Sequence, residues 1–301
     1  MKADQIKAWG HSLRLRTIPL SISGAIIAGG LAASYGVWRT DVFILMLLTA
    51  SFLQILSNMA NDYGDFSKGT DNDDRIGPAR ALQRGDIKPR TFLIGTLVVC
   101  MITMMIGLAL VLVSFGVEAI YTVLLFLALG ASCIWAAIRY TVGKRAYGYH
   151  GLGDIFVFIF FGIVPVVGGL FLYTHSVEVL SFLPAAGIGL MSSGVLNLNN
   201  MRDVENDRVM GKRTLASQMS FTGGKIYHSS LLVVAMACFI SYQCLTSHTG
   251  LWYVLCIIPL FNVWTIWTVK ERKGYDKYLK VLSMSAFVMS ILFSVAINMP
   301  M

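Results

Sequence analysis

The stretch TFLIGTLVVCMITMMIGLALVLV, residues 91–113, contains no charged side chain. A helix needs about 20 consecutive apolar residues to cross the hydrocarbon core of a bilayer. Because lipid cannot hydrogen-bond the backbone, such a stretch satisfies its own peptide groups as an α-helix. Eight further apolar stretches follow or precede it along the chain. We expect spans at about residues 17–37, 41–61, 91–113, 117–138, 154–173, 180–201, 226–247, 251–269 and 281–299.

The overall composition supports the same fold class. Of 301 residues, 56% are apolar and only 13% are charged, whereas soluble domains carry about 25% charged residues. These figures exclude a soluble globule, a disordered chain and a collagen-like fibre. The sequence therefore predicts an all-α, polytopic membrane protein of about nine helices, forming one domain over residues 1–301.

The distribution of positive charge predicts the topology. The net charge is +8, and 23 of the 24 Lys and Arg residues fall on one side of the expected spans. Only Arg39 falls on the other side. Basic loops face the cytoplasm in membrane proteins, so we expect the N-terminus and the loops at 62–90 and 202–225 there. This explanation of the charge requires no nucleic-acid partner.

An internal repeat relates these two loops. Each follows a span that ends in asparagines, and the matched residues are separated by 141 positions for the first two pairs and 142 for the last two. A four-helix unit duplicated in parallel, with one additional helix, explains both this spacing and the odd number of spans. The matched sets are Asn58, Asp62, Asp65 and Gly69 in the first loop region, and Asn199, Asp203, Asp207 and Gly211 in the second.

The acidic pairs predict a metal site. If the spans continue as helices beyond the membrane edge, each pair lies on one helical face, because its members are three or four residues apart. Oxygen ligands without histidine or cysteine suit Mg²⁺, which completes its shell with water or phosphate. Two such clusters would hold a diphosphate through bridging ions. The expected ligands, which are also the expected catalytic acids, are Asp62, Asp65, Asp203 and Asp207; Asp71 is either a further ligand or a loop residue.

Amides and cations beside the acidic pairs complete the expected substrate site. Amides at the ends of apolar helices are poorly placed without a polar ligand, although Asp and Asn also cap helix ends in solvated loops. Arginine and lysine bind phosphate, and the same residues also serve as topology determinants. The candidates are Asn58, Asn61, Asn199, Asn200, Arg14, Lys68, Arg80, Lys144, Arg202 and Lys212.

A polyprenyl diphosphate fits such a protein, since apolar helices accommodate its tail. Ionisation of an allylic diphosphate leaves a carbocation, which aromatic faces stabilise. Tyr140, Tyr147 and Tyr149 are candidates for this role, although aromatic residues also gather at membrane interfaces. Asp154, at the start of the fifth span, is expected either to act as a base or acceptor-binding group, or simply to favour a helix N-terminus.

These motifs resemble a known family. The patterns N-x-x-N-D-Y-x-D-x-x-x-G-x-D (58–71) and N-N-x-R-D-x-x-x-D-x-x-x-G-K (199–212) are similar to the two aspartate-rich motifs of the UbiA superfamily of intramembrane prenyltransferases. The segments LRLRTIP (13–19), GPARALQRGDI (77–87) and YTVGKRAYGYHGLGDIFVFIFFG (140–162) resemble its menaquinone branch, the 1,4-dihydroxy-2-naphthoate polyprenyltransferases. The resemblance runs from about residue 9 to the end of the chain.

The resemblance implies an Mg²⁺-dependent enzyme of menaquinone biosynthesis in a bacterial inner membrane. It would transfer a polyprenyl group from its diphosphate to 1,4-dihydroxy-2-naphthoate with loss of CO2. Two alternatives stay open: a prenyltransferase for another aromatic acceptor such as 4-hydroxybenzoate, and a secondary transporter. A transporter would place ionisable groups or broken helices near the midplane, whereas these spans carry their acids at one edge. A CDP-alcohol phosphotransferase would carry one dense acidic motif rather than two separated ones.

Overall fold

The computed structural model describes residues 2–70, 80–247 and 252–299, and within these residues the chain is helical and contains no strand. Eight helical segments there are long and apolar enough to cross a membrane, and a shorter apolar helix, α12, accompanies them. The expectation of about nine spans is confirmed. The principal helices are α1 (Lys2–Leu13), α2 (Ile18–Ser34), α3 (Thr40–Ser67), α4 (Pro89–Phe115), α5 (Ile120–Arg139), α6 (Gly153–Phe158), α7 (Gly169–Thr174), α8 (Phe182–Arg202), α9 (Val204–Val209), α10 (Leu215–Gln218), α11 (Phe221–Leu245), α12 (Trp252–Thr268) and α13 (Tyr275–Ala296).

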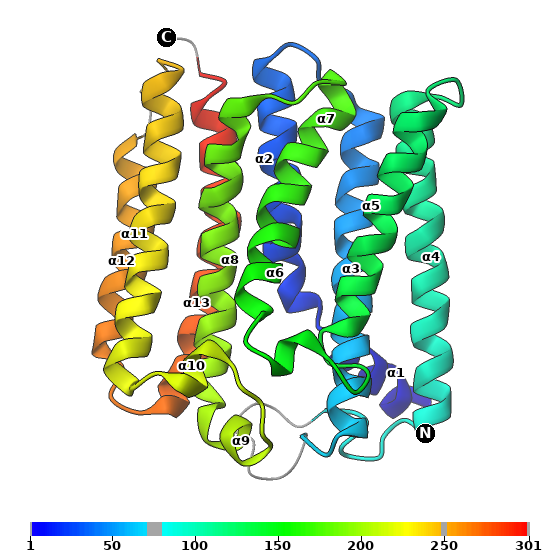
Figure 1. Ribbon diagram of the computed structural model, residues 1–301, viewed down its shortest axis with the longest axis vertical. Coiled ribbons are helices and arrows are strands. Elements are labelled where there is room, and N and C mark those ends of the chain that lie inside the picture. The colour runs from blue at the N-terminus through cyan, green and yellow to red at the C-terminus, as the bar shows by residue number, and fades with distance from the viewer. Residues whose placement is uncertain (1, 71–79, 248–251, 300–301) are drawn as a thin grey trace.

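The long helices run side by side as one bundle (Figure 1). Helix α1, the ends of α3 and α8, α9, α10 and the connection from α12 to α13 lie at one end of this bundle. The connection from α2 to α3, which contains Arg39, lies at the opposite end. The separation of basic segments expected from the sequence is therefore present in the fold.

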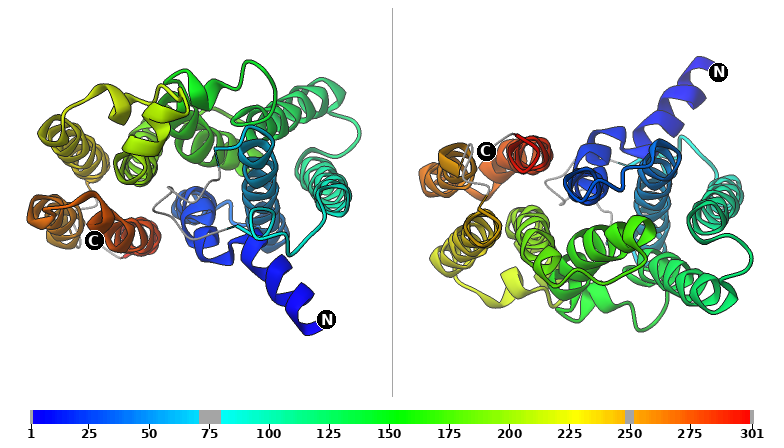
Figure 2. Two further views of the ribbon diagram at one scale, coloured as in Figure 1. Left: turned by 90° about the horizontal axis from the view of Figure 1, so that it is seen from below. Right: turned by 90° about the horizontal axis from the view of Figure 1, so that it is seen from above.

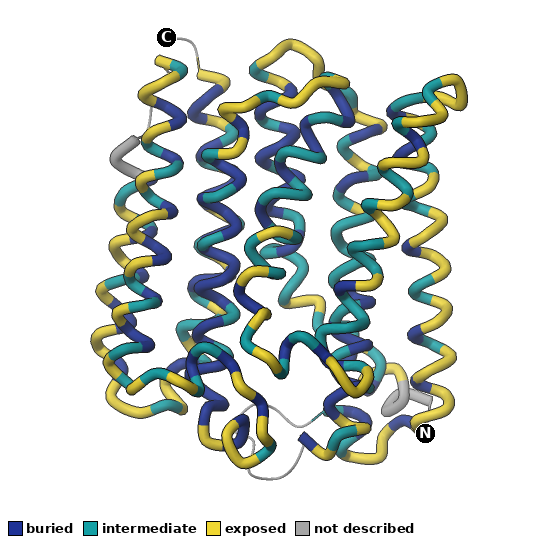
Figure 3. The backbone as a smooth tube through the Cα atoms, in the orientation of Figure 1, coloured by how far each residue is buried: buried dark blue, intermediate teal, exposed yellow. Residues whose placement is uncertain are grey.

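Burial differs sharply between the helices (Figure 3). Helix α8 is buried over most of its length, whereas α4 presents many exposed positions. Beyond its first turn, the exposed side chains of α4 are apolar, among them Ile94, Leu97, Met101 and Met105. Lipid tails are as apolar as these side chains, so α4 forms part of the lipid-facing surface and α8 forms part of the core.

Glycines allow α8 to approach the fifth span closely. A Cβ atom on Gly162 would lie 2.5 Å from the carbonyl oxygen of Ala185 and 2.7 Å from the Cα atom of Gly189. Small residues at such contacts let membrane helices pack backbone against backbone. This contact places the fifth span beside the helix that carries the second acidic motif.

The fifth span is not a regular α-helix, in contrast to the expectation for 154–173. It consists of α6, a π-helical segment η3 (Ile159–Gly168) and α7. Pro165 lies inside η3, and proline removes a backbone donor and disfavours the α-helical hydrogen-bond pattern. Wider π-helical turns frequently occur at functional sites, and η3 faces the cavity described below.

The first acidic motif is helical, as expected. Helix α3 continues to Ser67, so Asp62 and Asp65 lie in its last two turns. The second motif differs: α8 ends at Arg202, and the backbone turns at Asp203 before α9 begins. The expectation of one continuous helix is therefore wrong there, although the Asp207 amide still donates to the Asp203 carbonyl at 2.9 Å.

Both motifs end in the same backbone turn. Gly69 and Gly211 adopt φ values of +71° and +68°, a left-handed conformation in which glycine avoids steric strain. The following amides return to the acidic residues: Thr70 donates to the Asp65 carbonyl at 3.0 Å, and Lys212 donates to the Asp207 carbonyl at 2.7 Å. These are Schellman turns, and their matched positions agree with the internal repeat in the sequence.

Candidate active site

A cavity of about 640 Å³ lies among α3, α4, α5, η3 and α8. Its deep end is apolar and includes Met46, Leu110, Phe126 and Leu172. Met46 and Asp65 both line it, and the nineteen residue steps from one to the other along α3 correspond to about 28 Å at 1.5 Å per step. Its other end is polar and includes Asn61, Asp65, Arg80, Asn199, Asp203, Asn206, Asp207 and Lys212.

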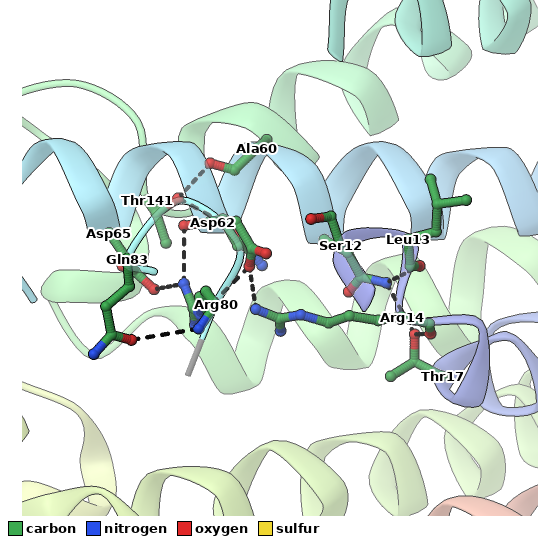
Figure 4. A network of polar contacts seen from close by, with 12 residues as sticks. Ser12, Leu13, Arg14, Thr17, Ala60, Asp62, Asp65, Arg80, Gln83 and Thr141 are labelled. Carbon is green, nitrogen blue, oxygen red and sulfur yellow. Dashed lines mark hydrogen bonds and ion pairs between the residues drawn. The ribbon is translucent and has the colours of Figure 1, made fainter. Parts of the chain in front are cut away.

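Two arginines neutralise the first motif (Figure 4). Arg14 donates to Asp62, and Arg80 Nε lies 3.4 Å from the same carboxylate oxygen. Arg80 Nη1 donates to Asp65 Oδ2 at 2.8 Å. Both carboxylates are almost completely buried, and charges in such positions require partners. The structure thus brings together Arg14, Arg80, Asp62 and Asp65, four of the candidate site residues from the sequence.

Asn58 joins the N-terminal segment to this motif. Its side-chain amide donates to the Leu13 carbonyl at 3.2 Å and to Thr17 Oγ1 at 3.0 Å. Gln54, one turn earlier on α3, donates to Asn58 Oδ1 at 3.0 Å. The amide therefore holds the turn that carries Arg14 against α3, which is a positioning contact and does not reach the cavity.

The second motif pairs its carboxylates with different cations. Arg202 donates to both oxygens of Asp203, at 2.9 and 2.7 Å, and also reaches Asn199 and Asp276. Lys212 Nζ lies 3.6 Å from Asp207 Oδ1. Asp276 of α13 thus belongs to the same network of ion pairs, although it lies outside both sequence motifs.

The Asp207 carboxylate, which lies outside the spans, has a perturbed pKa. Burial raises its pKa to about 6, and Lys212 only partly opposes this effect. Burial alone would lower the pKa of the Lys212 ammonium, but Asp207, Asp65 and Tyr149 outweigh it, so that pKa is raised. Asp207 Oδ2 is buried and has no hydrogen-bond partner. An uncompensated carboxylate oxygen at the polar end of a cavity is a suitable place for a cation.

Tyr149 connects the two motifs. Its hydroxyl donates to Asp65 Oδ1 at 2.9 Å and lies 2.6 Å from Thr70 Oγ1. Asn206, in the second motif, donates to the Thr70 carbonyl at 3.1 Å. Lys68 lies over the Tyr149 ring, with Nζ 3.7 Å from its centroid. The sequence suggested only an aromatic role for Tyr149, because its partners lie in separate segments.

Aromatic rings form one wall of the cavity between its polar and apolar ends. Tyr140 meets Tyr147 edge to face with centroids 5.4 Å apart, and Tyr147 stacks on Phe156 at 3.9 Å. Phe160 continues the row, 5.9 Å from Phe156, and all four rings line the cavity. Burial raises the pKa of the Tyr140 hydroxyl, and the negative charge of Asp65 adds to the effect.

Several predicted residues lie away from the cavity lining. Asp154 is buried, and its carboxylate accepts a hydrogen bond from Tyr227 at 3.1 Å. Asn200 is also buried, and its side-chain oxygen has no hydrogen-bond partner. Lys144 is exposed on the loop after α5. Asp71 lies outside the described residues.

The polar end suits magnesium by the chemistry of its donors. Its carboxylates and amides supply oxygen, and Asp207 Oδ2 is available without breaking a hydrogen bond. Within the described residues, no group of three His, Cys, Asp or Glu side chains lies close enough to hold a metal by itself. Mg²⁺ commonly takes only one or two protein carboxylates and shares the rest of its shell with water and substrate phosphate. The site therefore fits a metal that binds together with a phosphate.

These features define a polytopic membrane protein that combines an ionic site with a long apolar cavity, an arrangement suited to a lipid-like molecule with an anionic head. The chain belongs to the UbiA prenyltransferase family, which it matches over residues 22–292.

The relatives extend over nearly the whole chain. It is 38% identical to 1,4-dihydroxy-2-naphthoate octaprenyltransferase of Haemophilus influenzae, over 98% of this chain and 96% of that protein. It is 42% identical to the Escherichia coli protein of the same name, over 85% and 83% of the two chains. A UbiA homologue from Archaeoglobus fulgidus, solved with DMAPP and Mg²⁺ bound, shares the fold with a TM-score of 0.55 at 14% identity, over 94% and 99% of the chains.

Proposed function

We propose that this protein transfers a polyprenyl group from polyprenyl diphosphate to 1,4-dihydroxy-2-naphthoate, a step of menaquinone biosynthesis. The products are CO2, diphosphate and a demethylmenaquinone in its reduced form. The supporting observation is one cavity that joins buried carboxylates and cations to an apolar tunnel of about 28 Å along α3. Relatives at 38% and 42% identity carry the name of this activity.

The polar end receives the diphosphate in this proposal. Asp62, Asp65, Asp203 and Asp207, with Asp71 as a further candidate, hold Mg²⁺, which neutralises charge on the departing diphosphate. Cations of the chain contribute to the same neutralisation, since arginine and lysine bind phosphate oxygens. The proposed phosphate-binding residues are Arg14, Lys68, Arg80, Arg202 and Lys212, with Asn61 and Asn199 as polar neighbours. Lys144, Asn58 and Asn200 lie away from the cavity lining, so their proposed contact with the substrate requires a rearrangement.

The bond changes balance without an added reactant. The bond between C1 of the prenyl chain and the diphosphate oxygen breaks, and its electron pair leaves with the diphosphate. A ring carbon of the naphthoate supplies the pair for the new bond to C1. The bond to the carboxylate carbon breaks as CO2 leaves, and its electron pair remains with the ring.

The wall of the cavity protects the reacting carbon. Tyr140 and Tyr147 present aromatic rings between the ionic end and the tunnel, where ring faces stabilise positive charge. The apolar lining excludes water that would otherwise react with an allylic cation. Asp154 is proposed to bind or deprotonate the acceptor; because it now contacts Tyr227, this role requires rearrangement of its side chain.

We place the protein in a bacterial inner membrane with its motif end in the cytoplasm. The basic connections gather at that end of the bundle, and positively charged loops remain cytoplasmic. The proposed partners are the lipid bilayer, the prenyl donor and the aromatic acceptor, and no nucleic acid is required.

The test is an assay on membranes that contain the protein, supplied with 1,4-dihydroxy-2-naphthoate, a polyprenyl diphosphate and Mg²⁺. Mass spectrometry should detect a prenylated product that lacks the carboxylate. The Asp203→Asn variant should lose the product, whereas Asp86→Asn, which alters an exposed ion pair with Arg84, should keep it. Product only from another acceptor, such as 4-hydroxybenzoate, would contradict the proposed substrate, and folded protein inactive with every acceptor would contradict the proposed activity.

A further inference from the structure

Helix α1 runs across the direction of the spans. Figure 2 shows it extending outward from the bundle at the end that carries the motifs. The chain changes direction directly after it, at Arg14, whose φ of +46° and ψ of 50° are left-handed. This conformation is sterically unfavourable for a residue with a Cβ atom, and strain of this kind persists where surrounding contacts impose it.

One side of α1 is fixed to the protein. Ala8 and Ser12 are buried, and the Trp9 indole stacks on the Phe92 ring of α4 with centroids 5.6 Å apart and planes 5° apart. Ala8 and Phe92 belong to a small apolar cluster that also contains Met59 of α3. The contacts to the bundle therefore hold the C-terminal half of α1 at the base of α3 and α4.

The other side of α1 and the turn after it combine apolar and basic side chains. Ile6 is 72% exposed and Leu15 is 54% exposed. Lys7, His11 and Arg16 are exposed as well. A helix with this combination, lying parallel to a bilayer, inserts its apolar side chains among the acyl chains and places its cations beside anionic headgroups.

The adjacent part of α4 extends this surface. Lys88 and Arg90 at its start are exposed, and they are followed by exposed Ile94 and Leu97. The apolar residues belong to the lipid-facing side of the bundle, so the level of the headgroups lies close to the start of α4. Helix α1, which contacts that start through Trp9, thus continues the membrane-facing surface at the same level.

We propose that α1 docks on the anionic lipid surface of the membrane and that this docking positions the first acidic motif. The end of α1 contacts the first acidic motif directly. Leu13, the last residue of α1, accepts the Asn58 amide at 3.2 Å, and Arg14 donates to Asp62. Lipid that holds α1 flat also maintains the strained turn and keeps the Arg14 guanidinium at the motif. The effect on turnover rests on the proposed function, whereas the docking does not.

The experiment uses full-length protein in nanodiscs of phosphatidylcholine, with or without phosphatidylglycerol. Hydrogen–deuterium exchange at residues 6–16 should be slower with phosphatidylglycerol. In the Lys7→Gln/Arg16→Gln double variant this protection should fall by about fivefold for each cation removed. The matched control, Lys270→Gln/Lys273→Gln, removes two exposed cations from the same end of the bundle and should keep it.

Turnover measured in the same nanodiscs separates the two proposals. We expect phosphatidylglycerol to increase kcat in the wild type and in the control, but not in the Lys7→Gln/Arg16→Gln variant. Exchange that does not respond to phosphatidylglycerol would overturn the docking, and so would protection that depends on protein concentration, because a second copy would then cover α1. Lipid-dependent protection with lipid-independent turnover would overturn the coupling to the motif. Protection in a protein inactive with every acceptor would support the docking while refuting the proposed function.

Discussion

Removing the Tyr149 hydroxyl should reduce turnover while leaving the fold intact. The Tyr149→Phe substitution keeps the ring beneath Lys68 but removes the hydrogen bond to Asp65 Oδ1 and the contact with Thr70 Oγ1. Asp65 would then lose a side-chain hydrogen bond that, together with the one from Arg80, orients it at the polar end of the cavity. Thr70, whose carbonyl accepts a hydrogen bond from the Asn206 side chain of the second motif, would also lose its contact with the hydroxyl.

The structure gives the size of the effect. A hydrogen bond to a charged group contributes about 1.5–3 kcal/mol. Tyr149 is only partly buried, and Asp65 keeps its 2.8 Å contact with Arg80, so the lower value applies. About 1.4 kcal/mol corresponds to a tenfold change in rate. We therefore expect kcat/KM to fall by about tenfold.

The assay is product formation from polyprenyl diphosphate and 1,4-dihydroxy-2-naphthoate, with protein amounts normalised by folded fraction. Tyr278→Phe is the matched control, because the Tyr278 hydroxyl lies 3.0 Å from Thr268 Oγ1 and forms no hydrogen bond with a carboxylate of the described residues. Both variants lose a contact between tyrosine and threonine hydroxyls, but only Tyr149→Phe loses the bond to a motif carboxylate. Equal kcat/KM in wild type and Tyr149→Phe, or an equal loss in both variants, would refute the reasoning.

Three further predictions concern the ionic site and the packing. Arg80→Gln leaves buried carboxylates poorly compensated and should lower the free energy of unfolding by about 3 kcal/mol or more. A denaturation midpoint below that of the wild type would show this loss. Arg84→Gln, which changes an exposed arginine, is the control, and equal midpoints for the two variants would contradict the prediction. Chelation by EDTA should abolish product formation and added Mg²⁺ should restore it, so undiminished activity in EDTA would exclude the metal proposal. Gly162→Ala places a Cβ atom 2.5 Å from a carbonyl oxygen of α8 and should destabilise by about 1–3 kcal/mol through overpacking. Gly107→Ala, whose Cβ atom meets nothing within 4 Å, should be at least as stable as the wild type, because alanine favours a helix more than glycine does.

The helical spans were predictable because hydrophobicity over about 20 residues is a strong, local signal. The end of α3 was predictable for a related reason: Asp62 and Asp65 follow the span at helical spacing, and nothing in the intervening sequence breaks the helix. The matched Asn, Asp and Gly positions also predicted where the two motifs resemble each other. Gly69 and Gly211 indeed end them with the same turn.

The interruptions were not predictable in detail. At Asp203 the chain turns, the carboxylate pairs with Arg202, and α9 begins directly afterwards. The sequence reveals only the local helical preference at this position, and tertiary contacts override such a preference. Pro165 indicates a disturbed helix in the sequence, but it does not specify a ten-residue π-helical segment. The α1 helix was also missed, because its apolar side chains are few and its packing partners lie on α3 and α4.

Contacts between side chains from distant segments could not be predicted from the sequence either. The hydroxyl of Tyr149 meets Asp65 across 84 positions, and Tyr227 meets Asp154 across 73. Neither pair lies at helical or strand spacing, so no periodicity indicates it. The roles of the motif residues as ligands and catalysts stay predictions, since contacts within the protein describe their neighbours and not their substrates.

The position of the carboxylates within their helices has an energetic consequence. Asp65 lies in the last turn of α3, and Asp203 directly follows the end of α8. The C-terminus of a helix carries the negative end of its macrodipole, which disfavours acidic groups there by about 0.3–1 kcal/mol. Asp203 is also the N-cap residue of α9, and Asp207 lies in the first turn of that helix, where the dipole favours acidic groups. The penalty therefore falls on Asp65, which lies only at the C-terminal end of a helix. Any cation that binds there removes this penalty, so that folding and ion binding reinforce each other thermodynamically.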